Sequence, residues 1–259
     1  MSSQSLALVA RGIVVASLMI GEGVRHGPGR SEFDRFFAEV MPAYPSRFTN
    51  SHPGGTMKLS HAVPLIAAMI SGMLIAADLT KKTWDFEKDE SGRIAKGFTN
   101  EVGQWEVAND GDNHVLYQKA KNDDATFNVA LVEGTSCKDI DLSVKLKAVA
   151  GEVDRGGGLV WRAKDSKNYY LARYNPLEDN FRVYKVQDGK RTQFQSAKIP
   201  GDDKWHTLRV TMVVTKIACY LDGQKYLEVE DATFPEAGMI GLWSKADAQS
   251  YFDDLTVSE

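Results

Sequence analysis

The chain has 259 residues, of which 43% are hydrophobic and 25% are charged, with a formal net charge of −4 at pH 7. This is the composition of an ordinary globular protein. Because basic residues are interspersed with acidic ones and the balance is acidic, the sequence predicts no nucleic-acid partner and no binding to an anionic membrane. The length allows one large all-β domain or two smaller ones.

The first 77 residues differ from everything that follows. Residues 1–56 combine an interrupted apolar run with a stretch rich in Gly, Pro and Arg, and no strand or helix period fits them. From Met57, a lysine precedes an apolar stretch that is too short to span a bilayer and ends in small residues, as secretory signals do. We therefore predict a signal peptide at 57–77 and a secreted or periplasmic protein that has no membrane partner after cleavage. Residues 1–56 are then a mis-extended N-terminus, irregular or disordered; a genuine N-terminal extension is the alternative.

The residues from 78 to 259 are predicted to form short strands and turns. Asp139–Val149 alternates strictly between apolar and polar side chains, which predicts a strand with one face on a core and one on water. Asp-Gly pairs at 188–189 and 222–223 are typical of tight hairpins, because they tolerate positive φ angles. About twelve or thirteen such strands without a helical pattern predict one all-β domain, a two-sheet antiparallel β-sandwich closed as a jelly roll. Three strands are expected in the central stretch, at Leu159–Arg162, Tyr169–Tyr174 and Phe181–Val186.

Four motifs in the last two fifths of the chain support this fold. They are WHTLRV at 205–210, YLDG at 220–223, GMIGLW at 238–243 and YFDDLTV at 251–257. In this order they resemble concanavalin A-like (laminin G-like) jelly-roll domains of secreted bacterial proteins. More narrowly, they resemble the 3-keto-disaccharide hydrolase-like group, loosely called family sixteen glycoside hydrolases. The resemblance implies the sandwich fold and a glycan or glycoside as the partner, but it does not by itself imply catalysis.

The stretch from Gly156 to Tyr184 contains many polar and aromatic side chains that a purely structural β-sheet would not require. Aromatic rings stack on the apolar faces of sugars, and amide, carboxylate and guanidinium groups bind their hydroxyls. We therefore predict a carbohydrate-binding face here, with Arg182 and Tyr184 opposite the core-facing Phe181 and Val183. The alternative is that the tyrosines cover the sandwich and the arginines form ion pairs with neighbouring acids. The candidate ligand-binding residues are Arg162, Tyr170, Arg173, Asn175, Glu178, Asn180, Arg182, Tyr184, Trp243 and Lys245.

The residues favour binding over catalysis. A retaining glucanase of the sixteenth family carries a Glu-x-Asp-x-x-Glu strand, which holds two carboxyl groups about 5–5.5 Å apart. The nearest stretch, Glu152-Val153-Asp154, lacks the third carboxylate. A hydrolase or lyase of (3-keto-)glycosides is the first alternative, because its chemistry needs a base rather than a fixed carboxylate pair, and Glu178 and His206 are the candidate bases. A protein-interaction domain is the second alternative, which a large exposed apolar patch would support.

The sequence predicts no cofactor, because no Cys/His cluster has the spacing of a metal site. The resemblance to concanavalin A-like domains implies one ion, a structural Ca²⁺ held by loop carboxylates. Its candidate donors are Asp78, Asp85, Asp110, Asp112, Asp253 and Asp254. Cys137 and Cys219 are the two cysteines, and the alternation of Cys219 with Ile217 and Leu221 favours two free thiols over a disulfide.

Overall fold

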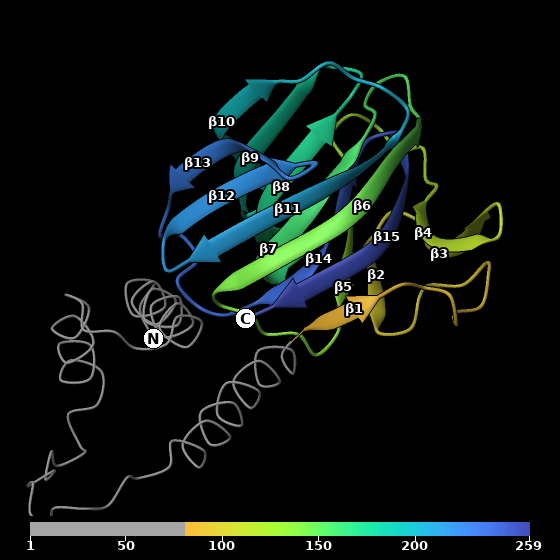
Figure 1. Ribbon diagram of the computed structural model, residues 1–259, viewed down its shortest axis with the longest axis horizontal. Coiled ribbons are helices and arrows are strands. Elements are labelled where there is room, and N and C mark those ends of the chain that lie inside the picture. Colours follow the sequence, from red (N-terminus) through yellow and green to blue (C-terminus); the bar gives the residue numbers. More distant parts are fainter. Residues whose placement is uncertain (1–80) are drawn as a thin grey trace, which may run out of the picture. The chain divides into compact units, whose positions relative to one another are not determined.

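The computed structural model describes residues 81–259, which form fifteen β-strands and, within that range, no helix (Figure 1). The strands build two antiparallel sheets packed face to face, so the predicted jelly-roll sandwich is confirmed. The described residues contain no helix that is long and apolar enough to span a bilayer. Residues 1–56, the predicted signal peptide at 57–77 and Asp78 all lie outside the described residues.

The first sheet has eight strands. Seven of them follow the hydrogen-bonded order β13–β12–β11–β6–β15–β4–β3, and β1 pairs with β15 off this path. Their bounds are Lys82–Trp84 for β1, Trp105–Asp110 for β3, Asn113–Gln118 for β4, Ile140–Ala150 for β6, Trp205–Val213 for β11, Lys216–Leu221 for β12, Gln224–Glu230 for β13 and Gln249–Ser258 for β15.

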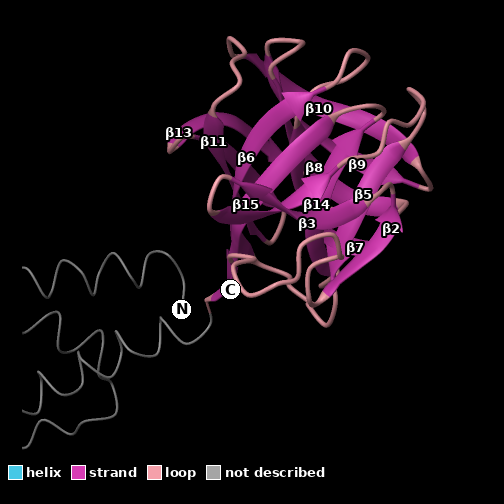
Figure 2. Ribbon diagram, turned by 90° about the vertical axis from the view of Figure 1, so that its right-hand side faces the viewer, coloured by secondary structure: helices cyan, strands magenta, loops and turns pink. Residues whose placement is uncertain are grey.

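The second sheet has seven strands in the order β10–β9–β8–β7–β14–β5–β2. In Figure 2, β6, β11, β13 and β15 of the eight-stranded sheet lie to one side of β5, β8 and β9 of the seven-stranded sheet. The bounds are Phe98–Val102 for β2, Phe127–Val132 for β5, Gly157–Asp165 for β7, Asn168–Asn175 for β8, Asn180–Gln187 for β9, Lys190–Lys198 for β10 and Met239–Lys245 for β14.

The main core lies between the two sheets. The alternation predicted for 139–149 is confirmed, because Ile140, Leu142, Val144, Leu146 and Ala148 of β6 are all buried. Opposite them Trp161 is fully buried, stacks on Tyr170 with ring centroids 5.6 Å apart, and donates its Nε1–H to Met212 Sδ at 3.1 Å. Each large apolar side chain buried in this way contributes roughly 1.5–3 kcal/mol. Both cysteines are buried and unbonded to each other, as the sequence indicated.

A second apolar cluster covers the outer face of the seven-stranded sheet, which is the face turned away from the eight-stranded sheet. Strands β7, β8 and β9 therefore carry buried apolar residues on both faces, although a solvated antiparallel sheet alternates with polar residues. Phe181 and Val183 face the core and Tyr184 faces outward, as expected from the alternation along β9. The buried members of the outer cluster are Val129, Leu131, Val160, Ala163, Tyr169, Leu171, Tyr184, Val186 and Trp243.

The seven-stranded sheet curves strongly toward this outer face. Arg191 on β10 and Phe127 on β5 are separated by five strand-to-strand steps in the sheet order. In a flat sheet these steps would span about 24 Å, far more than two side chains can bridge. Yet the guanidinium carbon of Arg191 lies 5.2 Å from the centre of the Phe127 ring. The outer face is therefore concave, and it gathers side chains from strands at both ends of the sheet.

Candidate functional site

The polar side chains of the central stretch meet on the concave face, where β8 turns into β9. Arg173 lies directly opposite Arg182, and Asn175 lies directly opposite Asn180. The turn between them supplies Glu178. The structure thus brings together five of the sequence-predicted ligand residues, and the pairing of β8 with β9 fixes their positions.

Glu178 is the centre of this polar group. Its Oε2 accepts hydrogen bonds from Arg173 at 2.8 Å, from Arg182 at 2.9 Å and from Asn180 at 3.0 Å. Burial alone would raise the pKa of Glu178, but these hydrogen bonds and the two guanidinium charges outweigh burial and lower the pKa. An anion held by two cations is a weak proton acceptor, so the geometry does not favour Glu178 as a catalytic base.

Asp154 lies beneath Glu178 and was not among the residues predicted from the sequence. Its carboxylate accepts hydrogen bonds from Arg173 Nη1 at 3.2 Å and from Asn175 Nδ2 at 2.9 Å, and it is only 2% exposed. Burial raises its pKa, and the charges of Arg173 and Lys245 only partly offset this. Asp247 holds the loop in place by accepting hydrogen bonds from the backbone N–H groups of residues 152–154. Arg173 therefore joins two carboxylates, one deep and one at the surface.

Aromatic rings form the other side of the site and hold Arg191. The guanidinium carbon of Arg191 lies 4.7 Å from the centre of the Tyr184 ring, 5.2 Å from Phe127 and 5.7 Å from Trp243. Trp243 is fixed in turn, because its Nε1–H donates to Tyr169 Oη at 3.1 Å. Burial lowers the pKa of Arg191. Sequence reasoning missed Arg191, because Lys190–Lys198 is polar at nearly every position and no apolar alternation marks it as a strand.

A glycine separates the two sides of the site. Gly158 on β7 pairs with Arg173 of β8 on one side and with Trp243 of β14 on the other. A Cβ at this position would lie 2.2 Å from the carbonyl oxygen of Ala172, so only glycine fits there without displacing the backbone. No side chain therefore stands between Arg173 and Trp243. We call the set Asp154, Arg173, Glu178, Arg182, Tyr184 and Arg191 the arginine site.

Three buried polar atoms of the arginine site have no hydrogen-bond partner among residues 81–259. They are Arg173 Nε, Tyr184 Oη and Arg191 Nη1; a fourth such atom, His114 Nδ1, lies on β4 in the other sheet. An unsatisfied buried donor or acceptor costs about 1–3 kcal/mol, and native proteins contain few of them. Three of the four such atoms in the described residues therefore lie in the arginine site.

Two sequence-predicted ligand residues lie away from this site. Arg162 is 2% exposed and donates to the carbonyl oxygens of Lys138, Phe234 and Val214. Tyr170 lies in the core between the sheets, where its hydroxyl donates to Asp231 at 2.6 Å. The polar atoms of both side chains are used inside the protein. Lys245 is closer to the site, because its Nζ lies 3.9 Å from Asp154 and forms an ion pair with Asp124.

His206, the other candidate base, lies on β11 of the eight-stranded sheet. Its Nδ1 is 2.7 Å from Asp222 and its Nε2 is 2.8 Å from Asp202. Burial alone would lower the pKa of His206, but the two carboxylates outweigh burial and raise it. With both ring nitrogens bound, His206 bridges two turns and has no nitrogen free for a substrate.

The five expected calcium donors within the described residues form no group of three or more acidic side chains placed to hold a metal. No group of three or more His, Cys, Asp or Glu side chains in the described part of the chain could hold a metal ion. Asp110 pairs with Lys147, Asp254 pairs with Lys145, and Asp253 accepts a hydrogen bond from Asn113. Asp78 lies outside the described residues, so the structural Ca²⁺ stays a prediction.

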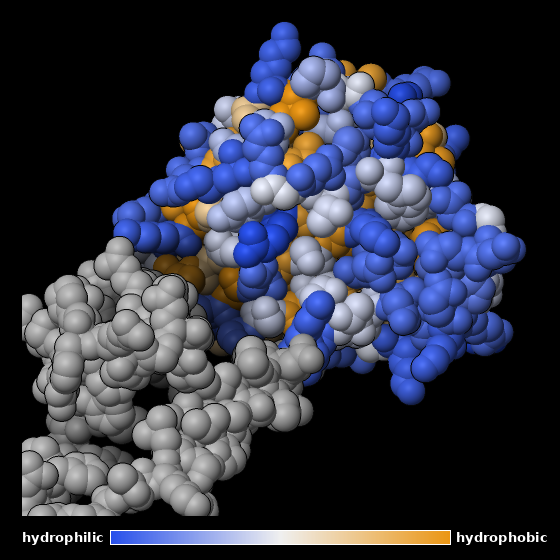
Figure 3. All heavy atoms as spheres, in the orientation of Figure 1, coloured by the Kyte–Doolittle hydropathy of each residue, from blue (hydrophilic) through white to orange (hydrophobic). Residues whose placement is uncertain are grey.

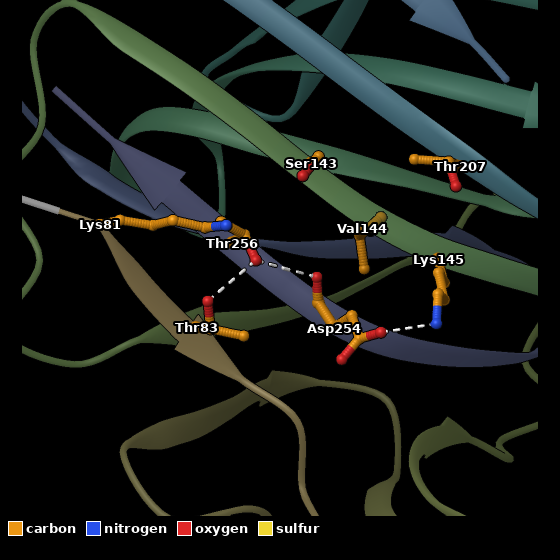
Figure 4. Close-up of a pocket in the computed structure, with 8 residues that line it drawn as sticks. All are labelled: Lys81, Thr83, Ser143, Val144, Lys145, Thr207, Asp254 and Thr256. Carbon is orange, nitrogen blue, oxygen red and sulfur yellow. Dashed lines mark hydrogen bonds and ion pairs between the residues drawn. The ribbon is translucent and has the colours of Figure 1, made fainter. Parts of the chain in front are cut away.

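A hollow of about 320 Å³ lies on the outer face of the eight-stranded sheet (Figure 4). Two of its charged groups pair, with Lys145 Nζ 2.6 Å from Asp254, and Thr83 and Thr256 hydrogen-bond to each other at 3.1 Å; Lys81 lines the hollow without an ion pair among the described residues. Apolar side chains are scattered among hydrophilic ones on the face shown in Figure 3, and hydrophilic side chains gather over β3 and β4. Where described residues are visible in this view, they form no broad apolar patch for a protein partner.

Comparison with known proteins supports the fold. No protein family model matches the chain. Levanase of Bacillus subtilis (strain 168) is 27% identical over 187 residues, which cover 68% of this chain and 24% of the levanase. The chain therefore spans about a quarter of that relative's length.

Solved structures of similar fold also support the β-sandwich. The carbohydrate binding module CBM66 from Bacillus subtilis superposes with a TM-score of 0.56 and 23% identity, over 66% of this chain and 99% of the module. A Crh5 transglycosylase in complex with NAG superposes with a TM-score of 0.51 and 11% identity, over 70% of this chain and 84% of the enzyme. The chain has a concanavalin A-like jelly-roll fold.

Proposed function

We propose that this chain is a carbohydrate-binding jelly-roll domain that binds sugar at the arginine site. The observation that carries the proposal is the set of three buried, unpartnered polar atoms, on Arg173, Tyr184 and Arg191, next to a half-exposed carboxylate and guanidinium. Planar groups of this kind bind vicinal sugar hydroxyls, and they lie on the concave face of a sandwich. The likeness to the carbohydrate binding module and to the levanase adds support.

Recognition at this site relies on hydrogen bonds more than on ring stacking. Trp243 and Tyr184 are 0% and 2% exposed, so their rings offer no free face to a sugar and instead hold the Arg191 guanidinium. Glu178 and Arg182 are the most accessible charged side chains of the site, at 40% and 30% exposure. A sugar would therefore meet Glu178 and Arg182 first and reach the buried donors behind them.

The experiment is a glycan-array screen of the full chain, followed by calorimetry on each binder, with Arg182→Ala compared with Arg209→Ala. Arg209 is a matched control because it also pairs with a carboxylate and lies over a tyrosine, but on the outer face of the eight-stranded sheet. We expect Arg182→Ala to weaken binding about tenfold or more, since hydrogen bonds from charged groups contribute about 1.5–3 kcal/mol. Absence of sugar binding by the wild-type chain would contradict the proposal. An equal loss of affinity in Arg182→Ala and Arg209→Ala would also contradict it.

A hydrolase or lyase acting on glycosides is the second candidate, and one observation favours it. Asp154 and Glu178 bind the same guanidinium, and their pKa values are shifted in opposite directions, raised for Asp154 and lowered for Glu178. Acid–base pairs in enzymes have this property. Mass spectrometry of the binders after incubation distinguishes the two functions: turnover that Asp154→Asn abolishes would establish the enzyme, and intact sugar would support the binding domain.

We further propose that the domain acts outside the cytoplasm. The basis is the signal-like pattern at 57–77, together with the sugar-binding proposal. N-terminal peptide mapping of the natural protein tests this directly. A mature N-terminus near residue 78 is the expected result, and peptides from residues 2–47 in the mature protein would contradict it.

A further inference from the structure

We propose that the sugar bound at the arginine site is acidic and that its carboxylate binds between Arg191, Arg173 and Tyr184. This inference rests on the proposed function and specifies its ligand class. It assigns the domain to uronate-containing polysaccharides rather than to neutral glycans.

The first argument is the charge of Arg191. Arg173, Arg182 and Arg209 each lie within 3.2 Å of a carboxylate oxygen. Arg191 forms no ion pair within residues 81–259 and is surrounded by the rings of Tyr184, Phe127 and Trp243. Burial removes water from part of this cation, and without a paired anion that desolvation cost is not fully offset. A bound anion would offset it.

The second argument is the hydrogen-bonding capacity of Arg191. Three aromatic rings lie within 6 Å of its guanidinium carbon, and these contacts leave the hydrogen bonds of its N–H groups to another partner. Two parallel N–H groups match the two oxygens of a carboxylate, and this bidentate pairing is the strongest contact that a guanidinium makes. The Nη1 atom on this group is one of the buried atoms without a partner.

The third argument is that two more buried polar groups without partners lie on neighbouring strands of the same face. Tyr184 on β9 lies opposite Leu171 on β8, two residues along from the Arg173–Arg182 pair, so Tyr184 and Arg173 are diagonal neighbours on one face. Such neighbours lie within reach of one ligand group. Both side chains are almost fully buried, and both have an unpartnered polar atom, Tyr184 Oη and Arg173 Nε.

The cations of the site differ in their ion pairing. Arg173, Arg182 and Lys245 each pair with a carboxylate, whereas Arg191 forms no ion pair among residues 81–259. A neutral hydroxyl would satisfy a hydrogen bond but leave the charge of Arg191 unpaired. A carboxylate satisfies both, while Glu178 remains available for the hydroxyls of the same sugar.

The test compares each uronate with its own methyl ester, which keeps the shape of the sugar and removes the charge. Calorimetry on the full chain uses D-glucuronate, D-galacturonate, D-mannuronate and L-guluronate, their methyl esters, the sulfate ester of a neutral sugar, and the neutral sugars. The variants are Arg191→Gln, which keeps two N–H donors but no charge, and Tyr184→Phe, which removes only the unpartnered hydroxyl. Arg209→Gln is the control, and circular dichroism checks the fold of every variant.

We expect at least one uronate to bind about tenfold more tightly than its methyl ester, and Arg191→Gln to remove that preference while Arg209→Gln retains it. The preference should also shrink as sodium chloride rises, since salt screens charge pairs. Equal binding of uronates and esters, a preference that survives in Arg191→Gln, or preference for the sulfate ester would overturn the carboxylate proposal. Neutral sugars that bind at the site without any uronate preference would overturn it and leave the proposed function intact; no sugar binding at all would overturn both.

Discussion

Arg173 and Arg182 lie directly opposite each other on β8 and β9 and donate to the same oxygen of Glu178, at 2.8 and 2.9 Å. Like charges directly opposite on neighbouring strands normally destabilise a sheet. The shared carboxylate offsets this repulsion and sets the two guanidinium groups side by side. Glu178 therefore positions the two guanidinium groups of the proposed sugar site, even though its lowered pKa makes it a weak base.

Glu178→Ala should release the repulsion between Arg173 and Arg182. We expect the free energy of unfolding to fall by about 1–2 kcal/mol, because two part-buried charged groups lose a partner. Salt at 0.5 M should restore part of the loss by screening the two cations, at a Debye length of about 4 Å. Urea unfolding at low and high salt measures both effects. Glu228→Ala, which removes an exposed partner of Lys225, is the control and should change little; a salt-independent loss in Glu178→Ala would contradict the explanation.

Tyr184→Phe should separate stability from binding. Its hydroxyl is buried without a partner, so its removal should raise the free energy of unfolding by about 1 kcal/mol while it weakens ligand binding. Tyr170→Phe is the matched comparison, because the Tyr170 hydroxyl donates to Asp231 and accepts from the backbone of Phe234. That variant should lower stability instead. Thermal unfolding of both proteins, free and with ligand, gives the answer, and destabilisation by Tyr184→Phe would count against a ligand role for its hydroxyl.

His206 should make stability depend on pH above about 6.5, its unfolded pKa. Its pKa in the folded protein is raised above the unfolded value of 6.5, so the folded state binds the proton more tightly. The stabilisation is therefore fully present below about pH 6.5 and is lost as pH rises through the folded pKa. His206→Gln should flatten the curve of unfolding free energy against pH over this window. Parallel curves for the two proteins between pH 6 and 9 would show that another group is responsible.

Arg162→Met should affect folding and not recognition. The change leaves three backbone carbonyls, those of Lys138, Phe234 and Val214, without their donor. We expect a loss of roughly 3 kcal/mol or more. Arg209→Met, which breaks a half-exposed ion pair, should lose about 1 kcal/mol or less. If the folded Arg162→Met protein bound sugar more weakly than wild type below its melting temperature, Arg162 would belong to the site after all.

Alternation along the strands was sufficient to predict part of the site. It correctly separated Arg182 and Tyr184 from Phe181 and Val183, because β9 keeps a strict two-residue period. It was less informative for β8, where both faces carry buried apolar residues, and Tyr170 proved to face the core. An irregularity explains Arg162: the pairing of β7 with β8 shifts register between Trp161 and Asp165, and Arg162 itself has a φ of 47°.

The remaining site residues were hidden for a different physical reason. Asp154 lies in a loop, where no period marks a residue as inward-facing. Arg191 approaches Phe127 only because the sheet curves, and curvature depends on packing between strands that are distant in the sequence. Local patterns report which face a residue occupies and not how a whole sheet bends.

Arg191 lies on β10, which ends the seven-stranded sheet and, within the described residues, pairs along its length with β9 alone. A terminal strand can detach locally at a lower free energy than global unfolding requires. Each detachment would remove Arg191 from Tyr184 and Trp243 while the rest of the sandwich stays folded. A ligand that binds Arg191 only while β10 is paired would therefore raise the free energy of this local opening. Amide hydrogen exchange along β10 would then slow as the site fills. The exchange rate of one strand then reports occupancy for any sugar, before its identity is known.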